Sequence, residues 1–397
     1  WVRIFLIFLG WIKEPFLLDL STTNYSFLSY FVIIYCSLYF GFIFFILKFF
    51  KKIVLKFIML PSLIVIAEVL CANIGYGFPW LSFALVHSNS NIGTALIYYI
   101  GTYGLSFISI AIFLFPYIFI SRSFVPKKIF LVIYLSFFFF FLILISSRST
   151  KENYTEENSI SVTIAQINFE VNQKLNKEST KEKQNYILNI IKENKNELLI
   201  FAENNYPYFM NEENVFLLQE NLDINSKLVI GATRKKDNQY FNSLFFISKN
   251  EYQHFDKKIL VPFGEFIPLR QYFNFMEFIA GTSDFSKGDQ DRKINYSNNY
   301  SFIPVICYEI IYFWKLINNK NNKSHFIINI TNDSWFGKFS GPYQHYYFAK
   351  LRAAEFNKPL IRVSNNGISA IFDNYGKKQE FIELNKRAIK ENKIYIP

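Results

Sequence analysis

The chain has 397 residues, of which 51% are hydrophobic and 20% aromatic, with 48 phenylalanines and a net charge of +11. This composition is too apolar for an ordinary soluble protein and indicates two unlike parts. The first 147 residues hold nine lysines and arginines against three acidic residues, which gives +6 of the total charge. The charge is therefore largely a sign of membrane topology, and a nucleic-acid-binding protein is not indicated.

The first part of the chain contains apolar segments that are long enough, or nearly so, to cross a membrane. About 20 apolar residues span the hydrocarbon core, and the uncharged segments 27–47, 92–120 and 129–147 meet this need. A further segment, 57–75, contains Pro61 and Glu68, which membrane helices tolerate when packed against protein or lining a cavity. For Glu68 we expect a buried hydrogen bond to a neighbouring helix rather than a functional role.

The charges around these segments predict their orientation. Lysine and arginine residues occur in the loops 48–56 and 121–128, whereas the loop 75–91 between them has none. By the positive-inside rule, the two basic loops face the cytoplasm, and the chain from Arg148 onward lies on the outer side of the membrane. Residues 4–12 have the composition of the end of another span. Because the chain starts inside that segment without an initiating methionine, we expect it to be incomplete at the N-terminus, so no signal peptide can be assessed.

From Ser159 the pattern changes to short apolar segments separated by amphipathic helices, which predicts an alternating α/β domain. We therefore expect a transmembrane domain at 1–147 and an outer domain at 148–397. Helices are predicted near 174–194, 211–222 and 343–357. Strands are predicted at 160–167, 198–202, 228–232, 243–247, 302–306, 326–330, 360–363 and 369–372.

Only one of the three cysteines, Cys307, lies outside the predicted spans. Cys36 and Cys71 fall within spans, so we predict no disulfide framework and a free thiol at Cys307, although its compartment is oxidising. The four histidines are scattered without the spacing of metal ligands, and we predict no metal site. They are His87, His254, His325 and His345.

Three polar residues stand at or just past predicted strand ends: Glu203, Lys257 and Cys307. Each alone has an ordinary explanation, namely a solvated strand end, a surface lysine flanking an apolar run and a small buried side chain. Together they form a chemical set. A carboxylate takes the thiol proton, the thiolate attacks a carbonyl, and the ammonium holds the negative charge of the tetrahedral intermediate.

Ordered motifs surround these residues, behind several membrane spans that include Gly77-Phe-Pro-Trp80. They are Phe-Ala-Glu203, Asp-Lys257-Lys-Ile-Leu-Val-Pro-Phe-Gly-Glu265, Ile-Cys307-Tyr-Glu309, Asn332-Asp-Ser-Trp335-Phe-Gly337, Gly341-Pro-Tyr-Gln-His345, Arg352-Ala-Ala-Glu355 and Ser364-Asn-Asn-Gly367. The set resembles the nitrilase, or carbon-nitrogen hydrolase, superfamily, and more closely its apolipoprotein N-acyltransferases. The resemblance covers nearly all of the chain.

The resemblance implies a membrane α-helical bundle carrying an α/β domain of the nitrilase type, an α-β-β-α sandwich. It implies Cys307 as nucleophile, Glu203 as general base and Lys257 as oxyanion stabiliser. Trp335 and Phe336 are expected to wall an acyl channel, although ordinary core packing explains either aromatic equally well. The supporting residues that it implies are Glu265, Tyr308 and Glu309, and the substrate-binding residues are Asn332, Trp335 and Phe336.

The implied reaction moves an acyl chain from a phospholipid, through a cysteine thioester, to the N-terminal amine of the S-diacylglyceryl cysteine of an apolipoprotein. It would take place at the bacterial inner membrane, with a multi-pass anchor and a periplasmic catalytic domain. The resemblance implies no cofactor and no nucleic-acid partner. Two alternatives remain: a membrane-tethered amidase that uses the same triad on a small amide, and a catalytically inactive lipoprotein-binding module.

The chain departs from the family pattern in two places. It has Lys174-Leu175 where the family usually has a Lys-Trp pair, and it ends at Pro397 without the family's closing span. We also expect apolar loops to border a lipid entrance at 78–83 and 263–278; the alternative for the second segment is that it packs under the domain, since aromatic-rich stretches are common in cores.

Overall fold

The computed structural model describes residues 2–18, 22–120, 135–136, 139–140, 158–170, 177–273, 277 and 283–397. The chain divides into two compact units. We call them the helical unit (Trp1–Gly10, Phe27–Asn153 and Ala354–Asn357) and the sandwich unit (Trp11–Ser26, Tyr154–Ala353 and Lys358–Pro397). The predicted domain boundary at residue 147 lies outside the described residues.

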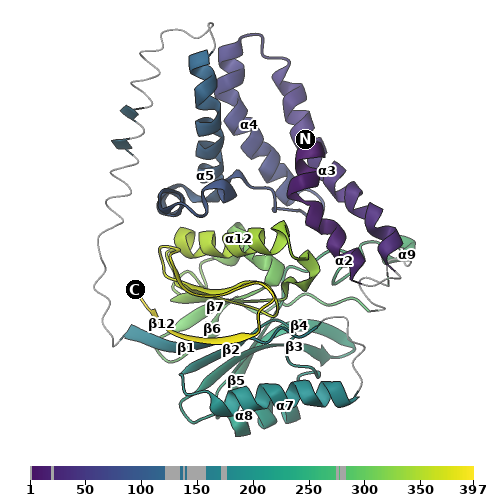
Figure 1. Ribbon diagram of the computed structural model, residues 1–397, viewed down its shortest axis with the longest axis vertical. Helices are drawn as coiled ribbons and strands as arrows, with labels where there is room; N and C mark the ends of the chain where they lie inside the picture. The colour runs from purple at the N-terminus through teal and green to yellow at the C-terminus, as the bar shows by residue number, and fades with distance from the viewer. Residues whose placement is uncertain are drawn as a thin grey trace. The chain divides into compact units, whose positions relative to one another are not determined.

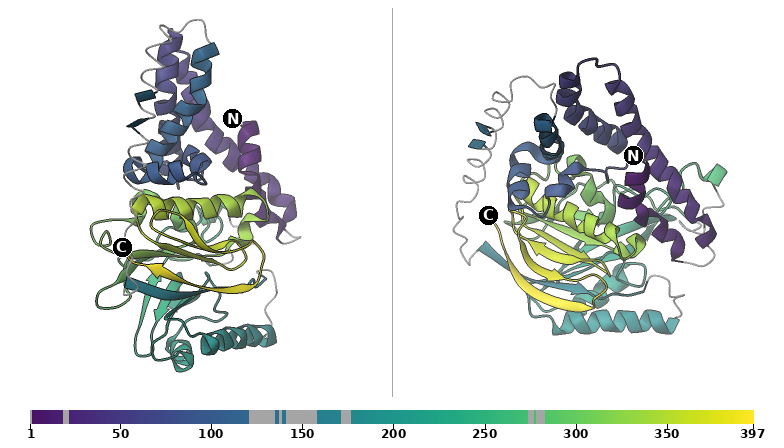
Figure 2. Two further views of the ribbon diagram at one scale, coloured as in Figure 1. Left: turned by 60° about the vertical axis from the view of Figure 1, so that its left-hand side comes forward. Right: turned by 45° about the horizontal axis from the view of Figure 1, so that its top comes forward.

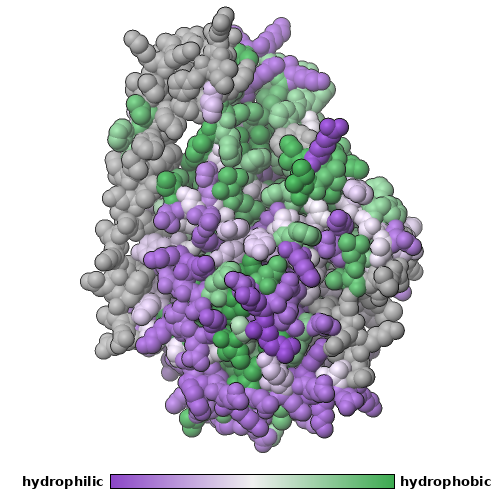
Figure 3. Space-filling model, in the orientation of Figure 1, coloured by the Kyte–Doolittle hydropathy of each residue, from purple (hydrophilic) through white to green (hydrophobic). Residues whose placement is uncertain are grey.

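The helical unit contains three helical segments that are long and apolar enough to cross a membrane, Thr23–Leu47, Ile53–Asn73 and Asn91–Leu114. They coincide with three predicted spans, whereas the predicted span 129–147 lies almost entirely outside the described residues. On the face shown in Figure 3, the coloured residues of the upper part are mostly apolar, as expected for helices that are hydrophobic all round. The described helices here are α1 (Val2–Phe8), α3 (Ser29–Leu47), α4 (Ile53–Asn73), η3 (Phe83–His87) and α5 (Asn91–Ile120).

Two positions in these helices depart from an ordinary apolar helix: the buried acid Glu68 and the break at Gly101. Glu68 is buried in α4, and its Oε1 accepts a hydrogen bond of 2.8 Å from the backbone N–H of Phe83, the first residue of η3. This is the kind of structural contact that the sequence predicts for an acid in an apolar span. The helix α5 is broken at Gly101, where φ is +65° and the left-handed region favours glycine.

The sandwich unit contains two six-stranded sheets, with the orders β12-β1-β2-β3-β4-β5 and β11-β10-β9-β8-β7-β6. Their central strands β1, β2 and β3, and likewise β7, β8 and β9, run parallel. The strands are β1 (Ser159–Gln166), β2 (Leu198–Phe201), β3 (Lys227–Lys236), β4 (Gln239–Ile247), β5 (Tyr252–Asp256), β6 (Ile294–Asn295), β7 (Ser301–Ile306), β8 (Phe326–Thr331), β9 (Leu360–Ser364), β10 (Ser369–Phe372), β11 (Lys378–Ile382) and β12 (Ala388–Tyr395).

Helices cover the outer faces of both sheets (Figures 1 and 2). The first sheet carries α7 (Lys177–Glu193) and α8 (Glu212–Asn221), and the second carries α12 (Ser340–Phe356). In α7 the buried residues Ile187, Ile190 and Ile191 recur at helical spacing, so one stripe packs into the core formed with β2 and β3. The predicted α-β-β-α sandwich is therefore confirmed.

The remaining described helices of the sandwich unit are short. They are η1 (Gly10–Lys13), α2 (Glu14–Leu17), η2 (Thr23–Leu28), α9 (Arg270–Phe273), η6 (Cys307–Ile311), α11 (Phe313–Leu316) and η7 (Asp333–Phe336). Residues 4–12, expected as the end of a span, form α1 and the first turn of η1. All eight predicted strands are present, but β5, β6, β11 and β12 were not predicted.

Candidate active site

The structure brings together three side chains that follow strands of both sheets. Glu203 lies two residues past β2, Lys257 directly follows β5, and Cys307 directly follows β7. Lys257 Nζ donates to Glu203 Oε1 at 3.3 Å and to the carboxylate of Glu265 at 3.0 Å. All four side chains are buried, with Lys257 only 2% exposed. An ammonium so enclosed needs paired carboxylates, and it has two.

One residue at the centre of this cluster was not predicted. Asn242, on β4, is buried, and its Nδ2 donates at 2.7 Å both to Glu203 Oε1 and to Glu265 Oε1. Its backbone carbonyl also accepts from the N–H of Lys257 at 2.9 Å. Asn242 therefore holds both carboxylates and the lysine backbone. The available signal was an asparagine directly before the strand predicted at 243–247.

Burial and charge shift the proton affinities of the three groups. Burial raises the pKa of Glu203, and Lys257 only partly opposes this. Burial alone would lower the pKa of Lys257, but Glu203 and Glu265 outweigh it and the pKa is raised. Burial, followed by the Glu203 carboxylate, raises the pKa of the Cys307 thiol, while Lys257 opposes the rise. The lysine is therefore charged, the cysteine rests as a thiol, and Glu203 is a stronger proton acceptor than a free carboxylate.

The backbone of Cys307 is strained. Its φ is +50°, in the left-handed region that residues with a side chain rarely adopt, at the junction between β7 and η6. Such strain costs on the order of 1–3 kcal/mol and persists only where surrounding contacts impose it. The junction therefore presents the thiol in a fixed direction at the carboxyl end of the strand.

Glu309 stabilises the junction between β7 and η6 through hydrogen bonds to the backbone. It has no exposed side-chain area, and it accepts from the backbone N–H groups of Lys258 (2.9 Å), Ile259 (3.1 Å) and Ile306 (3.0 Å). Arg292, which was not predicted, donates to both carboxylate oxygens at 2.7 Å. Burial would raise the pKa of Glu309, but Arg292 outweighs it and lowers the pKa. One ionised carboxylate therefore connects the backbone after Lys257 to the backbone before Cys307.

The other predicted residues take varied positions. Tyr308 is buried, and its hydroxyl accepts from the Tyr312 hydroxyl at 3.0 Å. The backbone N–H of Asn332 donates to Glu203 Oε2 at 2.9 Å, whereas its side chain accepts from Ser334 at the start of η7. Trp335 is 37% exposed.

Phe336 is buried against aromatic rings. It packs edge-on against Trp11 and His345, with ring centroids 4.8 Å and 5.2 Å away. The contacts of Phe336 are thus those of a packed aromatic, while Trp335 keeps an open face. Acyl-channel roles for Asn332, Trp335 and Phe336 stay predictions.

The two loops expected at a lipid entrance differ. In 78–83, Trp80 has no exposed area and its ring stacks on that of Phe78, and a lipid entrance at this loop stays a prediction. In 263–278, Leu269 and Tyr272 are 63% and 71% exposed. The side chain of Phe273, the residues 274–276 and the Lys174-Leu175 pair lie outside what the structure describes.

In the part of the chain that the structure describes, no group of three or more His, Cys, Asp or Glu side chains is arranged to hold a metal ion. All three cysteines are free.

Two family models match the chain. The carbon-nitrogen hydrolase model matches residues 161–381, and the model of the apolipoprotein N-acyltransferase N-terminal domain matches residues 2–114. Among solved structures, a CN-hydrolase superfamily protein from Xanthomonas campestris aligns with a TM-score of 0.45 at 14% identity, over 59% of this chain and 90% of that chain.

Curated relatives carry the name apolipoprotein N-acyltransferase. The Rickettsia typhi protein is 33% identical over 322 residues, which cover 78% of this chain and 64% of the relative. The Wigglesworthia glossinidia brevipalpis and Haemophilus influenzae proteins are 31% and 30% identical, over 80% and 76% of this chain and 65% and 61% of theirs. The chain thus spans less than two thirds of the length of these relatives. Because the carbon-nitrogen hydrolase model matches more than half of the chain, the protein belongs to the carbon-nitrogen hydrolase family.

Proposed function

We propose that this protein is an N-acyltransferase that moves an acyl chain from a phospholipid, through a thioester on Cys307, to the N-terminal amine of the S-diacylglyceryl cysteine of an apolipoprotein. The observation that carries the proposal is the buried Lys257, held by Glu203 and Glu265 beside a strained cysteine. The relatives named apolipoprotein N-acyltransferase and the apolar N-terminal helices support a lipid substrate.

In the first half of the reaction, Glu203 takes the proton of the Cys307 thiol, and the sulfur attacks the ester carbonyl carbon of the phospholipid. The carbonyl oxygen becomes an oxyanion, which the Lys257 ammonium stabilises, together with the backbone N–H of Tyr308. The tetrahedral intermediate then breaks its bond to the glycerol oxygen. That oxygen leaves with the proton from Glu203, which gives a lysophospholipid and the acyl thioester.

In the second half, the free amine of the lipoprotein's first residue attacks the thioester carbonyl. The same ammonium stabilises the second oxyanion. Glu203 takes a proton from the attacking nitrogen, and the bond between the carbonyl carbon and the Cys307 sulfur breaks. The amide product leaves, and the thiol is restored with a proton from Glu203, so the cycle needs no cofactor.

Both substrates are lipids embedded in a bilayer, which explains why an amidase-like domain is joined to apolar helices. Three lysines between α3 and α4, with Lys56 in the first turn of α4, support a cytoplasmic loop there, and with it a periplasmic catalytic domain on a multi-pass anchor in the inner membrane. Leu269 is a large apolar side chain and Tyr272 is a large aromatic one, and both are exposed. We place them at the lipid entrance, in contact with the headgroup region.

A membrane-tethered amidase is the second candidate, since the carbon-nitrogen hydrolase model matches the catalytic domain. The test is to incubate the full chain in detergent with a phospholipid that carries a labelled acyl chain and to measure the intact mass. We expect an added acyl chain that neutral hydroxylamine removes and that a diacylated lipopeptide accepts as an amide.

The controls separate the candidates. Cys307→Ser should give neither transfer nor a thioester, because a serine hydroxyl is a far poorer nucleophile without a base tuned to it. Transfer by that variant at the wild-type rate would refute the role of Cys307 as nucleophile. Absence of an acyl adduct together with release of ammonia from a small amide would favour the amidase, and absence of both activities would favour an inactive binding module.

A further inference from the structure

A second buried polar cluster lies beside Cys307, formed by Asp333, His345 and Arg362; we call it the His345 cluster. Asp333 begins η7 after β8, His345 lies on α12, and Arg362 lies on β9, the strand next to β8. All three side chains have no exposed area. The steps above do not use any of them.

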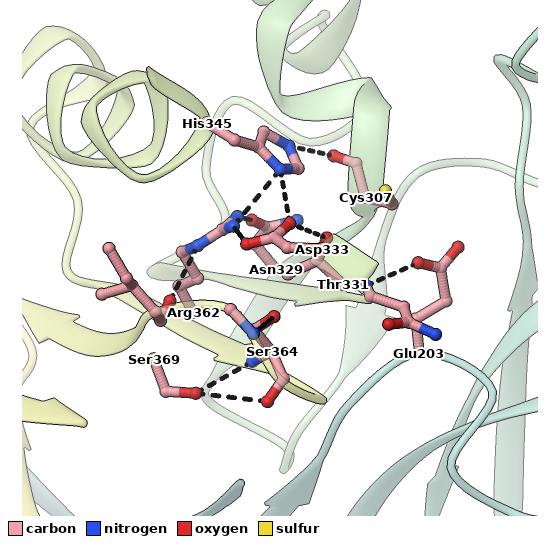
Figure 4. A network of polar contacts seen from close by, with 12 residues as sticks. Glu203, Cys307, Asn329, Thr331, Asp333, His345, Arg362, Ser364 and Ser369 are labelled. Carbon is pink, nitrogen blue, oxygen red and sulfur yellow. Dashed lines mark hydrogen bonds and ion pairs between the residues drawn. The ribbon is translucent and has the colours of Figure 1, made fainter. Parts of the chain in front are cut away.

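The contacts of the His345 cluster run toward the nucleophile (Figure 4). His345 Nε2 lies 3.2 Å from the backbone carbonyl oxygen of Cys307, and its Nδ1 lies 2.8 Å from Asp333 Oδ1. Arg362 Nη2 donates to Asp333 Oδ2 at 2.6 Å. Arg362 is itself fixed by Asn329 Oδ1 at 2.8 Å and by the carbonyl of Ile368 at 3.1 Å.

The direction of the contact with Cys307 follows from the chemistry of its two atoms. A backbone carbonyl oxygen can only accept, so Nε2 carries the proton and donates it. The carboxylate of Asp333 is ionised, because Arg362 and His345 outweigh its burial and lower its pKa to about 2. Burial lowers the pKa of His345, so the ring is neutral and its Nδ1 is an acceptor. Arg362 Nη2, which donates to Asp333, lies 3.2 Å from Nδ1 and can donate to it as well, so the guanidinium held by Asp333 fixes the imidazole in one orientation.

An Asp-His pair beside a cysteine has the composition of a protease triad, but the geometry is different. In a triad the histidine faces the nucleophilic atom, whereas here Nε2 contacts the backbone carbonyl of the nucleophile. Glu203 occupies the position of the base. The ring therefore acts on the conformation of Cys307 and not on its proton.

The energetics favour a positioning role. Replacing a buried ion pair by well-packed apolar residues is often neutral or stabilising, so burial of Asp333 and Arg362 is not explained by stability alone. Cys307 has a φ of +50°, a conformation that needs an external contact to persist. The hydrogen bond from His345 is such a contact, since it fixes the peptide group that follows the strained residue.

We propose that His345 is a positioning residue, which holds the Cys307 peptide in its left-handed conformation and so aims the thiol at Glu203 and Lys257, with Asp333 and Arg362 fixing the ring. The inference rests on the proposed role of Cys307 as nucleophile. It assigns His345 no contact with substrate and no proton transfer.

The test compares two substitutions of His345 in the full chain. Leucine removes the donor, whereas glutamine carries an amide N–H at nearly the reach of Nε2. Misplacing a reacting group by about 1 Å can cost about 100-fold, so we expect His345→Leu to slow acylation of Cys307 by labelled phospholipid by roughly 10- to 100-fold. His345→Gln should stay within a few-fold of the wild type, and the phospholipid concentration at half-maximal rate should not change for either variant.

The rate of alkylation of Cys307 by iodoacetamide gives a second readout that needs no lipid, and it should fall in His345→Leu and recover in His345→Gln. His325→Leu is the matched control. Its ring also contacts the backbone of β7, accepting at Nδ1 from the N–H of Ser301 at 3.2 Å, but at the opposite end of the strand from Cys307. We expect that control to acylate at the wild-type rate.

Three outcomes would overturn the inference. The first is a wild-type rate for His345→Leu in both assays. The second is an equal loss of acylation rate in the leucine and glutamine variants, which would indicate that the ring acts as a base. The third is a slowing of acylation in His325→Leu that equals the slowing in His345→Leu. If His345→Leu does not fold, His345→Asn replaces it, because its shorter amide cannot reach the Cys307 carbonyl, and equal rates for Asn and Gln would refute the role. Acyl transfer by Cys307→Ala would instead overturn the proposed function itself.

Discussion

Removing the charge of Glu309 tests how the backbone segments next to Cys307 and Lys257 are held in position relative to each other. The carboxylate accepts from three backbone N–H groups and from two nitrogens of Arg292, and neither side chain is more than 3% exposed. In Glu309→Gln one oxygen becomes an NH₂ group that faces donors. Arg292 is then a buried cation with a neutral partner.

The size of the effect follows from these contacts. Breaking a buried ion pair from one side costs about 3–5 kcal/mol, and each orphaned backbone donor adds about 1–3 kcal/mol unless the local structure relaxes. We expect Glu309→Gln to lower the free energy of unfolding by at least about 3 kcal/mol, which corresponds to a fall in Tm of roughly 6–12 °C for a domain of this size. Acylation of Cys307, measured well below the new Tm, should also be slower.

The assay is thermal unfolding of the full chain in detergent, with Asp291→Asn as the matched control. Asp291 is the residue before Arg292 and pairs with Lys320, but both partners are more than half exposed, so removing this pair should change Tm very little. A Tm within about 1 °C of the wild type for Glu309→Gln, or an equal loss in Asp291→Asn, would refute the reasoning about burial.

Four further expectations concern the reaction and its lipid substrate. Lys257→Arg should abolish acylation, because a planar guanidinium cannot place one compact charge where the ammonium lies; turnover at the wild-type rate would make Lys257 dispensable. Since burial raises the pKa of Glu203, and a base works only when deprotonated, kcat/KM should fall as the pH drops through a value above the ordinary 4.5, and an acid limb at or below 4.5 would contradict this assignment. Glu68→Gln should keep activity and membrane abundance, because the amide oxygen can still accept from Phe83; lost activity at normal abundance would place Glu68 near the lipid entrance. Leu269→Asn with Tyr272→Asn should slow acylation from phospholipid vesicles at nearly unchanged Tm, since both side chains are exposed and asparagine tolerates the positive φ of Leu269, whereas a large drop in Tm would show that these side chains are structural.

The central strands of both sheets could be predicted because they are buried on both faces. β2 reads as the apolar run Leu-Leu-Ile-Phe, and β8 reads as Phe-Ile-Ile-Asn-Ile-Thr, all buried. The missed strands β5 and β12 lie at the edges of the first sheet, where many side chains face solvent. β12 in particular contains the continuous polar run Lys-Glu-Asn-Lys at 390–393, so a search for apolar runs does not find it.

The candidate site was only partly predictable for a related reason. Glu203, Lys257 and Cys307 follow strands and belong to recognisable motifs, so their positions could be read from the sequence. Asn242 and Arg292 act through side chains that are close in space but 39 and 17 residues from the carboxylates they bind. The position of Asn242 directly before a predicted strand is the only local signal, and it does not identify a partner, because an isolated asparagine or arginine has many ordinary uses.

The burial of the site bears on the choice between acyl transfer and hydrolysis. An acyl thioester is lost when water reaches it, so a transferase must hold the intermediate in a closed environment until the amine arrives. Cys307 is 5% exposed, Glu203 is 4% exposed and Lys257 is 2% exposed, so these side chains have little contact with bulk solvent. A lipid amine delivered from the membrane brings its own apolar chains to fill the approach. If the proposed transfer takes place, we therefore expect the thioester to persist until the second lipid arrives, with little hydrolysis in the absence of a lipopeptide acceptor.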